Sequence, residues 1–216
     1  MHAVQFYHKM PKMTFFITGI STEVGKTVAS AIVVEALAAD YWKPIQAGDL
    51  DRSDSHKIEA LISNDCTVIH PNSYALNTPM SPHAAADIDG ISIQLDKIVL
   101  PTTKNDLVIE GAGGLMVPLN DTDTIYDLIQ SDYKVIVVSR HYLGSINHTL
   151  LTIEKLQQKG VAIGIIFSGN EHPTTEEIIL KKTGAVFLGR INEEKKFNKE
   201  VVKKYAAAFH EALLSF

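Results

Sequence analysis

The chain contains almost no cysteine and no long uninterrupted apolar run. Its 216 residues include one cysteine, Cys66, so neither an internal disulfide nor a zinc site built on several cysteines can form. The longest apolar stretch, Ala29 to Ala39, contains Glu35 and is shorter than the roughly 20 residues that span a membrane. We therefore expect no membrane anchor, an inert Cys66, and a location in the reducing cytoplasm.

An excess of basic charge is also missing. The formal net charge is −5, which gives no electrostatic reason to bind nucleic acid, and the lysine pairs near the C-terminus alternate with glutamates. The apolar content of 45% is sufficient for one packed core of ordinary size. Residues 1–12 lack the apolar segment of a secretory signal. We expect an N-terminal extension at 1–12 and a single domain at 13–216.

Strand-forming and helix-forming segments alternate along the chain. Runs rich in β-branched and aromatic residues predict strands at Thr14–Thr18, Tyr41–Ile45, Asp106–Glu110, Lys134–Ser139, Ala162–Phe167 and Ala185–Leu188. Helical patterns fall at Lys26–Ala39, Asp54–Ile62, Ile125–Ser131, Ser145–Lys159, Thr175–Lys182 and Lys199–Leu214. This order predicts an α/β fold, with a doubly wound, mostly parallel sheet and helices on both faces. Ligands of such sheets bind at the carboxyl ends of the strands.

The segment after the first predicted strand reads Gly-Ile-Ser-Thr-Glu-Val-Gly-Lys-Thr, from Gly19 to Thr27. A strand that passes through a glycine-containing turn into a helix leaves backbone N–H groups free to bind phosphate. Lys26 adds a cation for the β and γ phosphates, and the Thr27 hydroxyl suits Mg²⁺. The segment therefore predicts a P-loop that binds ATP or GTP.

The spacing of this loop is unusual. Five residues separate Gly19 from Gly25, one more than in the common fingerprint. The alternative is an ordinary strand-to-helix turn capped by Ser21 or Thr22. The order of strand, glycines, Lys-Thr and apolar helix favours nucleotide binding over that alternative.

Two carboxylates follow other predicted strands. Glu110 ends an apolar strand and precedes a glycine-rich turn, where an unpaired carboxylate would cost several kcal/mol. Its partner is either Mg²⁺ or the N–H groups of that turn. Asp54 precedes a helix, where an isolated Asp is usually an N-cap. Together, Thr27, Asp54 and Glu110 would also offer the hard oxygen ligands that Mg²⁺ prefers.

Lys43 lies before Pro44 at the end of another predicted strand, within the same crevice. Lys26 and Lys43 would present two cations to a transferring phosphoryl group, whose transition state needs charge stabilisation. The alternative for Lys43 is a solvated surface lysine. The histidines are spaced so that no pair shares a helix face, which argues against a transition-metal site.

Six blocks of the chain resemble the dethiobiotin synthetase family and occur in its order. They are Gly19–Thr27, Trp42–Gln46, Arg52–Asp54, Pro79–His83, Glu110–Gly114 and Leu143–His148. The resemblance implies a P-loop NTPase-like fold and an ATP-dependent cyclo-ligase of biotin biosynthesis. That reaction closes the ureido ring of dethiobiotin from 7,8-diaminopelargonate and CO₂ and releases ADP and phosphate. It uses ATP as co-substrate and Mg²⁺ as cofactor.

The same resemblance implies roles for individual residues. It makes Lys43, Lys26 and Thr22 catalytic, and Thr27, Asp54 and Glu110 ligands of the metal. The nucleotide would contact Glu23, Val24, Gly25, Lys26, Thr27, Val28, Asp54, Glu110, Gly111, Ala112, Gly113, Asn170 and Asn192. The substrate would contact Thr22, Lys43, Ala47, Gly113, Leu143, Gly144, Ser145 and Asn147. The family is a homodimer, and the helix start near Leu143 to Asn147 would receive the substrate carboxylate bound by the partner chain.

Three positions depart from the family pattern. Ala47 stands where the family usually has Ser or Thr, so a hydroxyl contact to substrate is missing. Asn170 is displaced from the end of the late strand that precedes it, and Asn192 replaces a proline of the base pocket. These changes leave the preference for ATP over other nucleoside triphosphates open.

Three other functions compete with this interpretation. A partition or metal-pump type ATPase carries a second lysine early in the loop, where this chain has Ser21. An amidotransferase-type synthetase would need a glutaminase partner or domain, for which the chain has no room. A regulatory module that holds nucleotide without turnover is the third alternative, and Lys43, Asp54 and Glu110 together favour catalysis over it.

Overall fold

The computed structural model describes residues 11–216. In this range seven parallel strands form the central sheet, in the spatial order β4 (Ile69–His70), β2 (Asp40–Trp42), β6 (Leu107–Gly114), β1 (Thr14–Gly19), β7 (Lys134–Arg140), β8 (Ala162–Ser168) and β9 (Val186–Ile191). The predicted α/β fold with a mostly parallel sheet is thereby confirmed. Most of the predicted extension, residues 1–10, lies outside the described residues.

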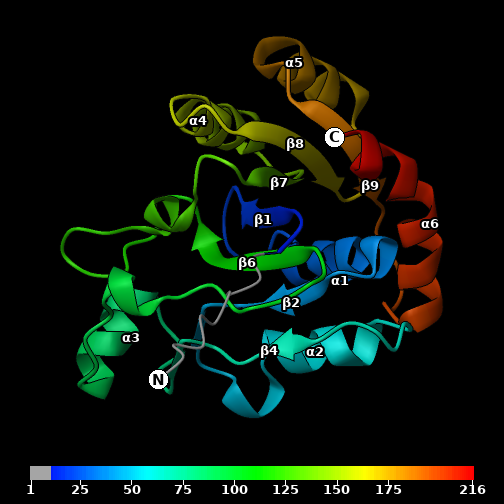
Figure 1. Ribbon diagram of the computed structural model, residues 1–216. Helices are drawn as coiled ribbons and strands as arrows, with labels where there is room; N and C mark the ends of the chain where they lie inside the picture. The colour runs from blue at the N-terminus through cyan, green and yellow to red at the C-terminus, as the bar shows by residue number, and fades with distance from the viewer. Residues whose placement is uncertain (1–10) are drawn as a thin grey trace, which may run out of the picture.

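Helices cover both faces of this sheet (Figure 1). One face carries α1 (Lys26–Leu37), α2 (Asp54–Leu61) and α6 (Lys199–Ser215), which pack against one another. The other face carries α4 (Ser145–Gln157) and α5 (Pro173–Thr183). A doubly wound arrangement of this kind brings the carboxyl ends of the strands to one edge, where the polar loops gather.

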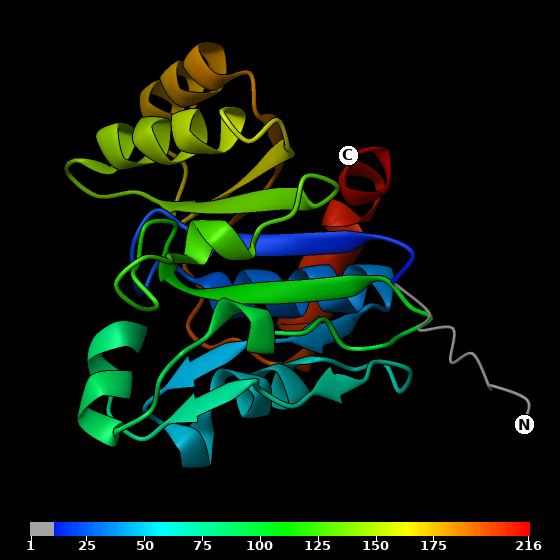
Figure 2. The ribbon, with the colours of Figure 1, turned by 60° about the vertical axis from the view of Figure 1, so that its left-hand side comes forward.

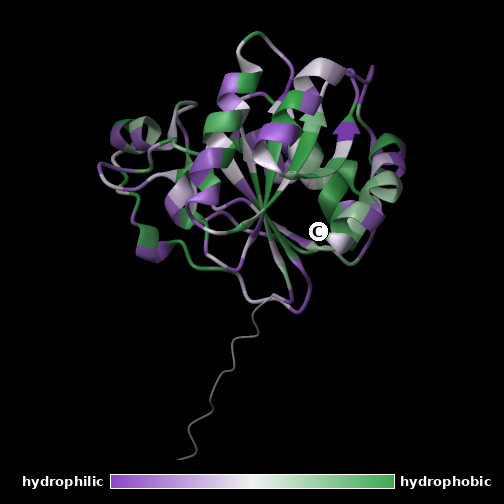
Figure 3. Cartoon of the chain, turned by 90° about the horizontal axis from the view of Figure 1, so that it is seen from above, coloured by the Kyte–Doolittle hydropathy of each residue, from purple (hydrophilic) through white to green (hydrophobic). Residues whose placement is uncertain are grey.

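The central strands are buried on both sides. Leu107, Val108 and Ile109 of β6 have almost no solvent exposure, and neither has the run from Val135 to Val138 in β7. Figure 3 shows hydrophobic residues along the central strands and more hydrophilic ones on the surrounding helices. Such continuous apolar strands are typical of parallel sheets with helices on both faces.

The predicted strand Tyr41–Ile45 is wrong as a single element. Pro44 has no N–H to donate, and the chain leaves the sheet after Trp42. It then forms β3 (Ile45–Ala47), which pairs with β5 (Tyr74–Leu76) in a separate two-stranded sheet. Figure 2 shows α3 (Pro82–Asp89) beside this small sheet. Lys43 therefore lies between two sheets.

Other predicted elements differ from the structure in extent. The helix predicted at Ile125–Ser131 is only a short 3₁₀ segment, Ile125–Leu128, and β6 continues through the glycines after Glu110. The structure also contains β4, β5, α3 and two further 3₁₀ segments, Leu50–Arg52 and Leu95–Lys97, which the sequence did not indicate. Within the described residues, no helix is both long and apolar enough to span a bilayer.

Candidate active site

The phosphate-binding loop connects β1 to α1. Gly25 precedes the first helical residue with a φ of 94°, and no side chain caps the helix. The alternative of a turn capped by Ser21 or Thr22 is therefore wrong. Glu23 also has a positive φ, 54°, which is strained for a residue with a side chain. The backbone is thus held in a shape that presents the uncapped start of α1 to the cleft.

The carboxylate of Glu110 is buried, with 1% of the residue exposed, and it accepts three hydrogen bonds from other side chains. Its Oε1 accepts from Thr27 Oγ1 at 2.9 Å and from Lys43 Nζ at 3.2 Å. Its Oε2 accepts from Tyr41 Oη at 2.9 Å. The alternative partner considered from the sequence, the glycine turn, is not what Glu110 binds here.

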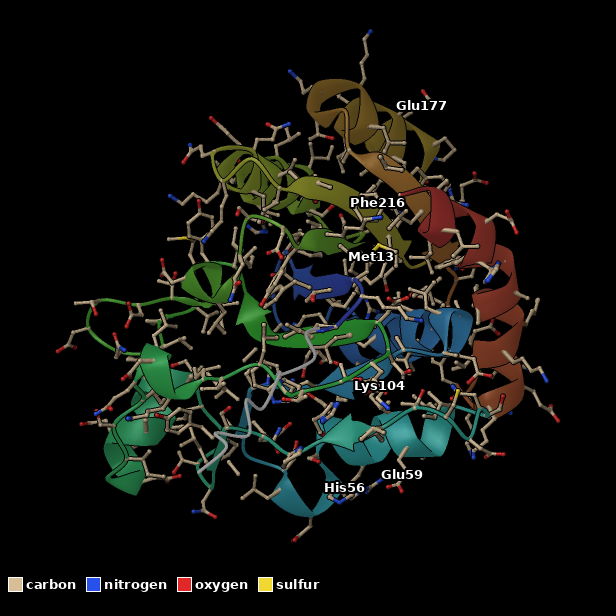
Figure 4. All side chains as sticks on the ribbon, viewed as in Figure 1. Met13, His56, Glu59, Lys104, Glu177 and Phe216 are labelled. Atoms are coloured by element: carbon tan, nitrogen blue, oxygen red, sulfur yellow. The ribbon has the colours of Figure 1, made fainter. Side chains whose placement is uncertain are left out.

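Asp54 is the first residue of α2 but not its N-cap. The cap is Ser53, whose side chain accepts from the backbone of His56, and the His56 ring binds back to the N–H of Ser53. Figure 4 labels His56 and, further along the same helix, Glu59. Because Ser53 caps the helix, the Asp54 side chain is free to bind Lys43 Nζ, and it also accepts from Lys57 Nζ at 2.8 Å.

Burial and charge act against each other at Lys43 and Asp54. Burial alone would lower the pKa of Lys43, but the adjacent charges of Glu110 and Asp54 outweigh it and raise that pKa above its usual value. Burial would likewise raise the pKa of Asp54, but the charge of Lys43 and its hydrogen bond bring it down to about 2. Lys43 and Asp54 therefore form an ion pair, and Glu110 accepts a further hydrogen bond from the same ammonium.

Lys26 has a different environment. Burial lowers its pKa to about 8, and the charge of Lys43 acts in the same direction, while Glu110 and Asp54 oppose the shift. Its Nζ donates to the carbonyl oxygen of Ser21 at 3.1 Å. Lys26 is thus a partly desolvated cation that lacks a carboxylate partner of its own and gains from a bound polyanion.

Lys26, Thr27, Lys43 and Asp54 line a cleft of about 750 Å³, whereas the buried Glu110 is absent from its wall and contacts it through Thr27 and Lys43. The predicted residues that line it are Thr22, Glu23, Gly25, Lys26, Thr27, Val28, Lys43, Asp54, Gly113 and Asn192. At its other end the walls come from the loops after β8 and β9, with Ser168, Gly169, Ile191, Glu193, Glu194 and Phe197. Lys26 and Lys43 therefore lie in the part of the wall beside the phosphate-binding loop, and glutamate, serine and apolar residues form the part on the loops after β8 and β9.

Several predicted residues do not line this cleft. Val24 is buried behind the loop, and Gly111 and Ala112 continue β6 beside it. Asn170 accepts a hydrogen bond from the backbone N–H of Glu193 at 3.4 Å, so it supports the loop that carries Asn192. Ala47, which was predicted to contact substrate, belongs to β3 and does not line this cleft.

The segment from Leu143 to Asn147 also lies outside the cleft. Leu143 is fully exposed, and α4 begins at Ser145 after Gly144, which has a φ of 104°. A second groove of about 460 Å³ shares Thr22 with the first cleft. Apolar side chains, among them Met116, Val117 and Leu151, form much of its wall.

The sequence of this chain is similar to known proteins over most of its length. A sequence model of the AAA domain family matches residues 13–201. The ATP-dependent dethiobiotin synthetase BioD of Christiangramia forsetii is 64% identical over 205 residues, which are 94% of this chain and 99% of that protein. The chain belongs to the dethiobiotin synthetase family. The protein of the same name from Cytophaga hutchinsonii is 53% identical, over 89% of this chain and 94% of that protein.

Solved structures are similar in fold. A ParA family ATPase from Chlorobium tepidum has a TM-score of 0.56 at 12% identity, covering 91% of this chain and 98% of that one. The MinC:MinD complex of Aquifex aeolicus contains a chain with a TM-score of 0.60 at 16% identity, covering 94% and 96% respectively. At these identities the likeness supports the P-loop α/β fold and carries no argument about function.

The donor set of this dethiobiotin synthetase family member is suited to magnesium. Thr27 supplies a hydroxyl, and Asp54 and Glu110 supply carboxylates that both reach the same ammonium of Lys43. Mg²⁺ takes few protein oxygens and completes its shell with water and phosphate. Within residues 11–216 there is no cluster of three or more His, Cys, Asp or Glu side chains placed for a metal, so a site made by protein carboxylates alone is not present there.

Three residues of the site were missed from the sequence. Tyr41 stands two positions before Lys43 at the end of a strand, so both can point to the same side. Lys57 follows Asp54 by three positions on α2, a spacing that makes helix neighbours. Arg140 ends β7 and lines the cleft, where its Nη1 lies 3.4 Å from the carbonyl oxygen of Glu23. The spacings of Tyr41 from Lys43 and of Lys57 from Asp54 were visible in the sequence, but the hydrogen bonds of Tyr41 and Lys57 and the position of Arg140 in the cleft were not.

Proposed function

We propose that this chain is an ATP-dependent dethiobiotin synthetase that closes the ureido ring of dethiobiotin from 7,8-diaminopelargonate and CO₂, with release of ADP and phosphate. The observation that carries the proposal is the hydrogen-bonded cluster beside the phosphate-binding loop of this chain, made by Thr27, Lys43, Asp54 and Glu110. The 64% identity to a protein named ATP-dependent dethiobiotin synthetase supports it. A cation between carboxylates beside a phosphate-binding loop suits phosphoryl transfer to a weak nucleophile.

The proposed reaction has three steps. One amine of the substrate captures CO₂ as a carbamate, and a carbamate oxygen attacks the γ-phosphate of ATP. The second amine then attacks the carbonyl carbon of the mixed anhydride, and phosphate leaves as the ring closes. Phosphorylation is needed because it turns a poor leaving oxygen into a good one.

The two lysines have separate roles in this proposal. Lys26, at the start of α1, holds the β and γ phosphates together with the loop N–H groups. Lys43 stabilises the charge that develops on the transferring phosphoryl group. Thr22 lies in the wall of both the nucleotide cleft and the second groove, which suits a residue that contacts substrate and loop at once.

Magnesium would be held by Thr27, Asp54 and Glu110. Bound there, Mg²⁺ would neutralise charge on the β and γ phosphates. Lys43 now holds both carboxylates, so metal entry requires its ammonium to turn toward the phosphates. The Lys43 ammonium would thus occupy the place between the two carboxylates until Mg²⁺ binds there.

We also propose a homodimer with substrate sites at the interface. Exposed apolar side chains on and around α4 support it: Leu143 is fully exposed, and Leu151 and Met116 are more than half exposed. Leu151 and Met116 line the second groove, which a partner chain would cover. The uncapped start of α4 would then face a substrate carboxylate, an arrangement that helix N-termini favour.

The remaining proposals concern extent and base. Residues 13–216 would act as one synthetase domain in the cytoplasm, with 1–12 as an extension. The base would lie between the loops that carry Gly169 and Asn192. The Asn192 side chain lines that end of the cleft, so adenine would meet an amide where the family pattern has proline.

The decisive experiment is product detection. The protein is incubated with 7,8-diaminopelargonate, bicarbonate and MgATP, and dethiobiotin is measured by mass spectrometry with each component omitted in turn. We expect dethiobiotin only in the complete mixture, with one phosphate released per ring closed. Phosphate release that does not depend on the diamine would instead favour a nucleotide-switch ATPase.

A further inference from the structure

We infer that Tyr41 is a positioning residue, which fixes the direction of the Glu110 carboxylate and thereby sets the affinity of the site for magnesium. The inference rests on the proposed function, in which Glu110 serves the metal of MgATP. The carrying observation is the hydrogen bond of 2.9 Å from Tyr41 Oη to Glu110 Oε2.

The geometry around Glu110 is divided between its two oxygens. Oε1 receives Thr27 Oγ1 and Lys43 Nζ, the two groups that belong to the cleft wall. Oε2 receives the Tyr41 hydroxyl. Tyr41 thus fixes Oε2, which makes no contact with the cleft wall, and Oε1 stays hydrogen-bonded to Thr27 and Lys43.

The strand arrangement explains why Tyr41 can do this. Tyr41 lies on β2 opposite Val108 of β6, and Glu110 is two residues further along β6, on the same side of that strand as Val108. The tyrosine ring spans this offset, and its hydroxyl meets the carboxylate at the end of the sheet. Lys43, two residues after Tyr41, reaches the same carboxylate from beyond the strand.

Burial gives the contact its energetic weight. Tyr41 has no exposed surface and Glu110 has 1%. A buried acceptor that loses its donor pays the full cost of desolvation, because water cannot replace the missing bond. Groups that hold metal-binding side chains in place commonly change metal affinity by about 10–100-fold when they are removed.

The test uses Y41F, E110Q and the double variant Y41F/E110Q. Y133F is the matched control, because it makes the same substitution at another buried tyrosine, which is 3% exposed and lies outside the cleft wall. Mg²⁺ is titrated in the presence of ADP, and the heat of binding is recorded by calorimetry.

We expect Y41F to raise the Mg²⁺ concentration for half-saturation by about 10–100-fold. In the product assay at saturating Mg²⁺, its kcat should stay within about twofold of the wild-type value, and Y133F should match the wild type throughout. If Tyr41 acts through Glu110, Y41F/E110Q should titrate like E110Q alone.

Two results would overturn the inference. One is an Mg²⁺ titration of Y41F that superimposes on that of the wild type. The other is an equal shift caused by Y41F in the wild-type and E110Q backgrounds, which would mean that Tyr41 acts independently of Glu110. Because the titration needs only Mg²⁺ and ADP, it stays informative even if the protein forms no dethiobiotin. Failure of the proposed function is thereby distinguished from failure of this inference.

Discussion

Lys43 is held by Asp54 and Glu110 at a point where a phosphoryl group would pass. In the resting protein its ammonium satisfies two buried carboxylates, and in the proposed reaction the same ammonium must face a phosphate. The residue thus has a structural role and a proposed catalytic role, and substitutions have to be chosen so that the two are separated.

The first prediction concerns this lysine. Lys43→Ala should reduce dethiobiotin formation below detection while nucleotide affinity changes by less than about tenfold, since the role of Lys43 lies in the transition state. Turnover and ATP affinity are measured separately. Lys57→Ala is the control, because Lys57 also forms a salt bridge with Asp54 but is more exposed than Lys43. Normal turnover by Lys43→Ala would remove Lys43 from the mechanism.

That variant should also be less stable. Removing one partner of a buried ion pair typically costs about 3–5 kcal/mol, because the remaining charges are left unpaired. Thermal melting with and without MgADP should show the loss, and the bound cation should restore part of it. An unchanged melting temperature would show that the carboxylates do not need Lys43.

A second prediction concerns Glu110. Glu110→Gln removes one negative charge but keeps the shape, so the Mg²⁺ concentration needed for half-maximal activity should rise by tenfold or more. Activity is followed across an Mg²⁺ titration at fixed ATP. An unchanged titration would exclude Glu110 from the metal shell.

At this scale the sequence was informative about residue types at strand ends and less so about their partners. Lys26, Lys43, Asp54 and Glu110 were all predicted for one crevice. Hydrogen bonds join Lys43 to Asp54 and Glu110, while Lys26 lines the same cleft and donates to the carbonyl oxygen of Ser21. Tyr41 was not predicted for the crevice, because a tyrosine in an apolar strand is indistinguishable from an ordinary core residue until the position of its hydroxyl is known. Asp54 was considered as an N-cap because a single sequence cannot distinguish it from its neighbour Ser53.

Among the elements, β2 is held in position by polar contacts of its first residue. Asp40, at its start, is 1% exposed and accepts hydrogen bonds from Thr103, Asn105, the backbone N–H of Val68 and the ring of His70. These bonds tie β2 to β4 and to the segment before β6. They hold in register the strand that carries Tyr41 and leads into Lys43.

The third prediction follows from this network. Burial would raise the pKa of Asp40, but the bonds from Thr103 and Asn105 outweigh it and lower that pKa below its usual value. A carboxyl with a lowered pKa in the folded state contributes stability that is present above the unfolded pKa of about 3.9. That contribution is lost as the pH falls through the folded pKa.

Asp40→Asn should therefore reduce the free energy of unfolding by about 1–3 kcal/mol at pH 7. The difference from the wild type should shrink as the pH is lowered below about 4. Denaturant unfolding at a series of pH values measures this difference. If the difference in the free energy of unfolding between Asp40→Asn and the wild type stays constant across the acid range, the charge of Asp40 does not contribute to stability.

The split of the predicted strand Tyr41–Ile45 shows what the pattern of residues could not reveal. The apolar and aromatic run is continuous, but Pro44 cannot donate to a neighbouring strand, and the chain turns into a second sheet. The short strand β4 was missed because two residues give no periodicity. The long, apolar strands β6 and β7 were predictable because burial on both faces leaves a clear signature.

For the whole molecule, one feature not accounted for within a single chain is the exposed apolar surface around α4. Leu143 is fully exposed, and Met116 and Leu151 line an adjacent groove that opens to solvent. A contiguous apolar surface of this kind is typical of a contact with another protein. The sequence alone could predict such a surface only through the family resemblance, since exposure is a property of the fold.

The fourth prediction tests this surface. If the proposed dimer forms through this surface, Leu143→Asp should give a monomer and raise the KM for 7,8-diaminopelargonate, while MgATP affinity is retained. Light scattering after size exclusion measures the mass, and Val99→Asp, at an exposed apolar residue distant in sequence, is the matched control. A wild-type protein that is monomeric at micromolar concentration would refute the dimer.

The order of strands has a consequence for synthesis on the ribosome. β6 lies between β2 and β1 in the sheet, although it follows both of them in the chain by more than sixty residues. A nascent chain that has emerged only as far as residue 106 has its phosphate loop but lacks the neighbouring strand and Glu110. Nucleotide can assist folding only after this late strand is inserted, so a fragment that ends before it should be a target for proteolysis even when ATP is abundant.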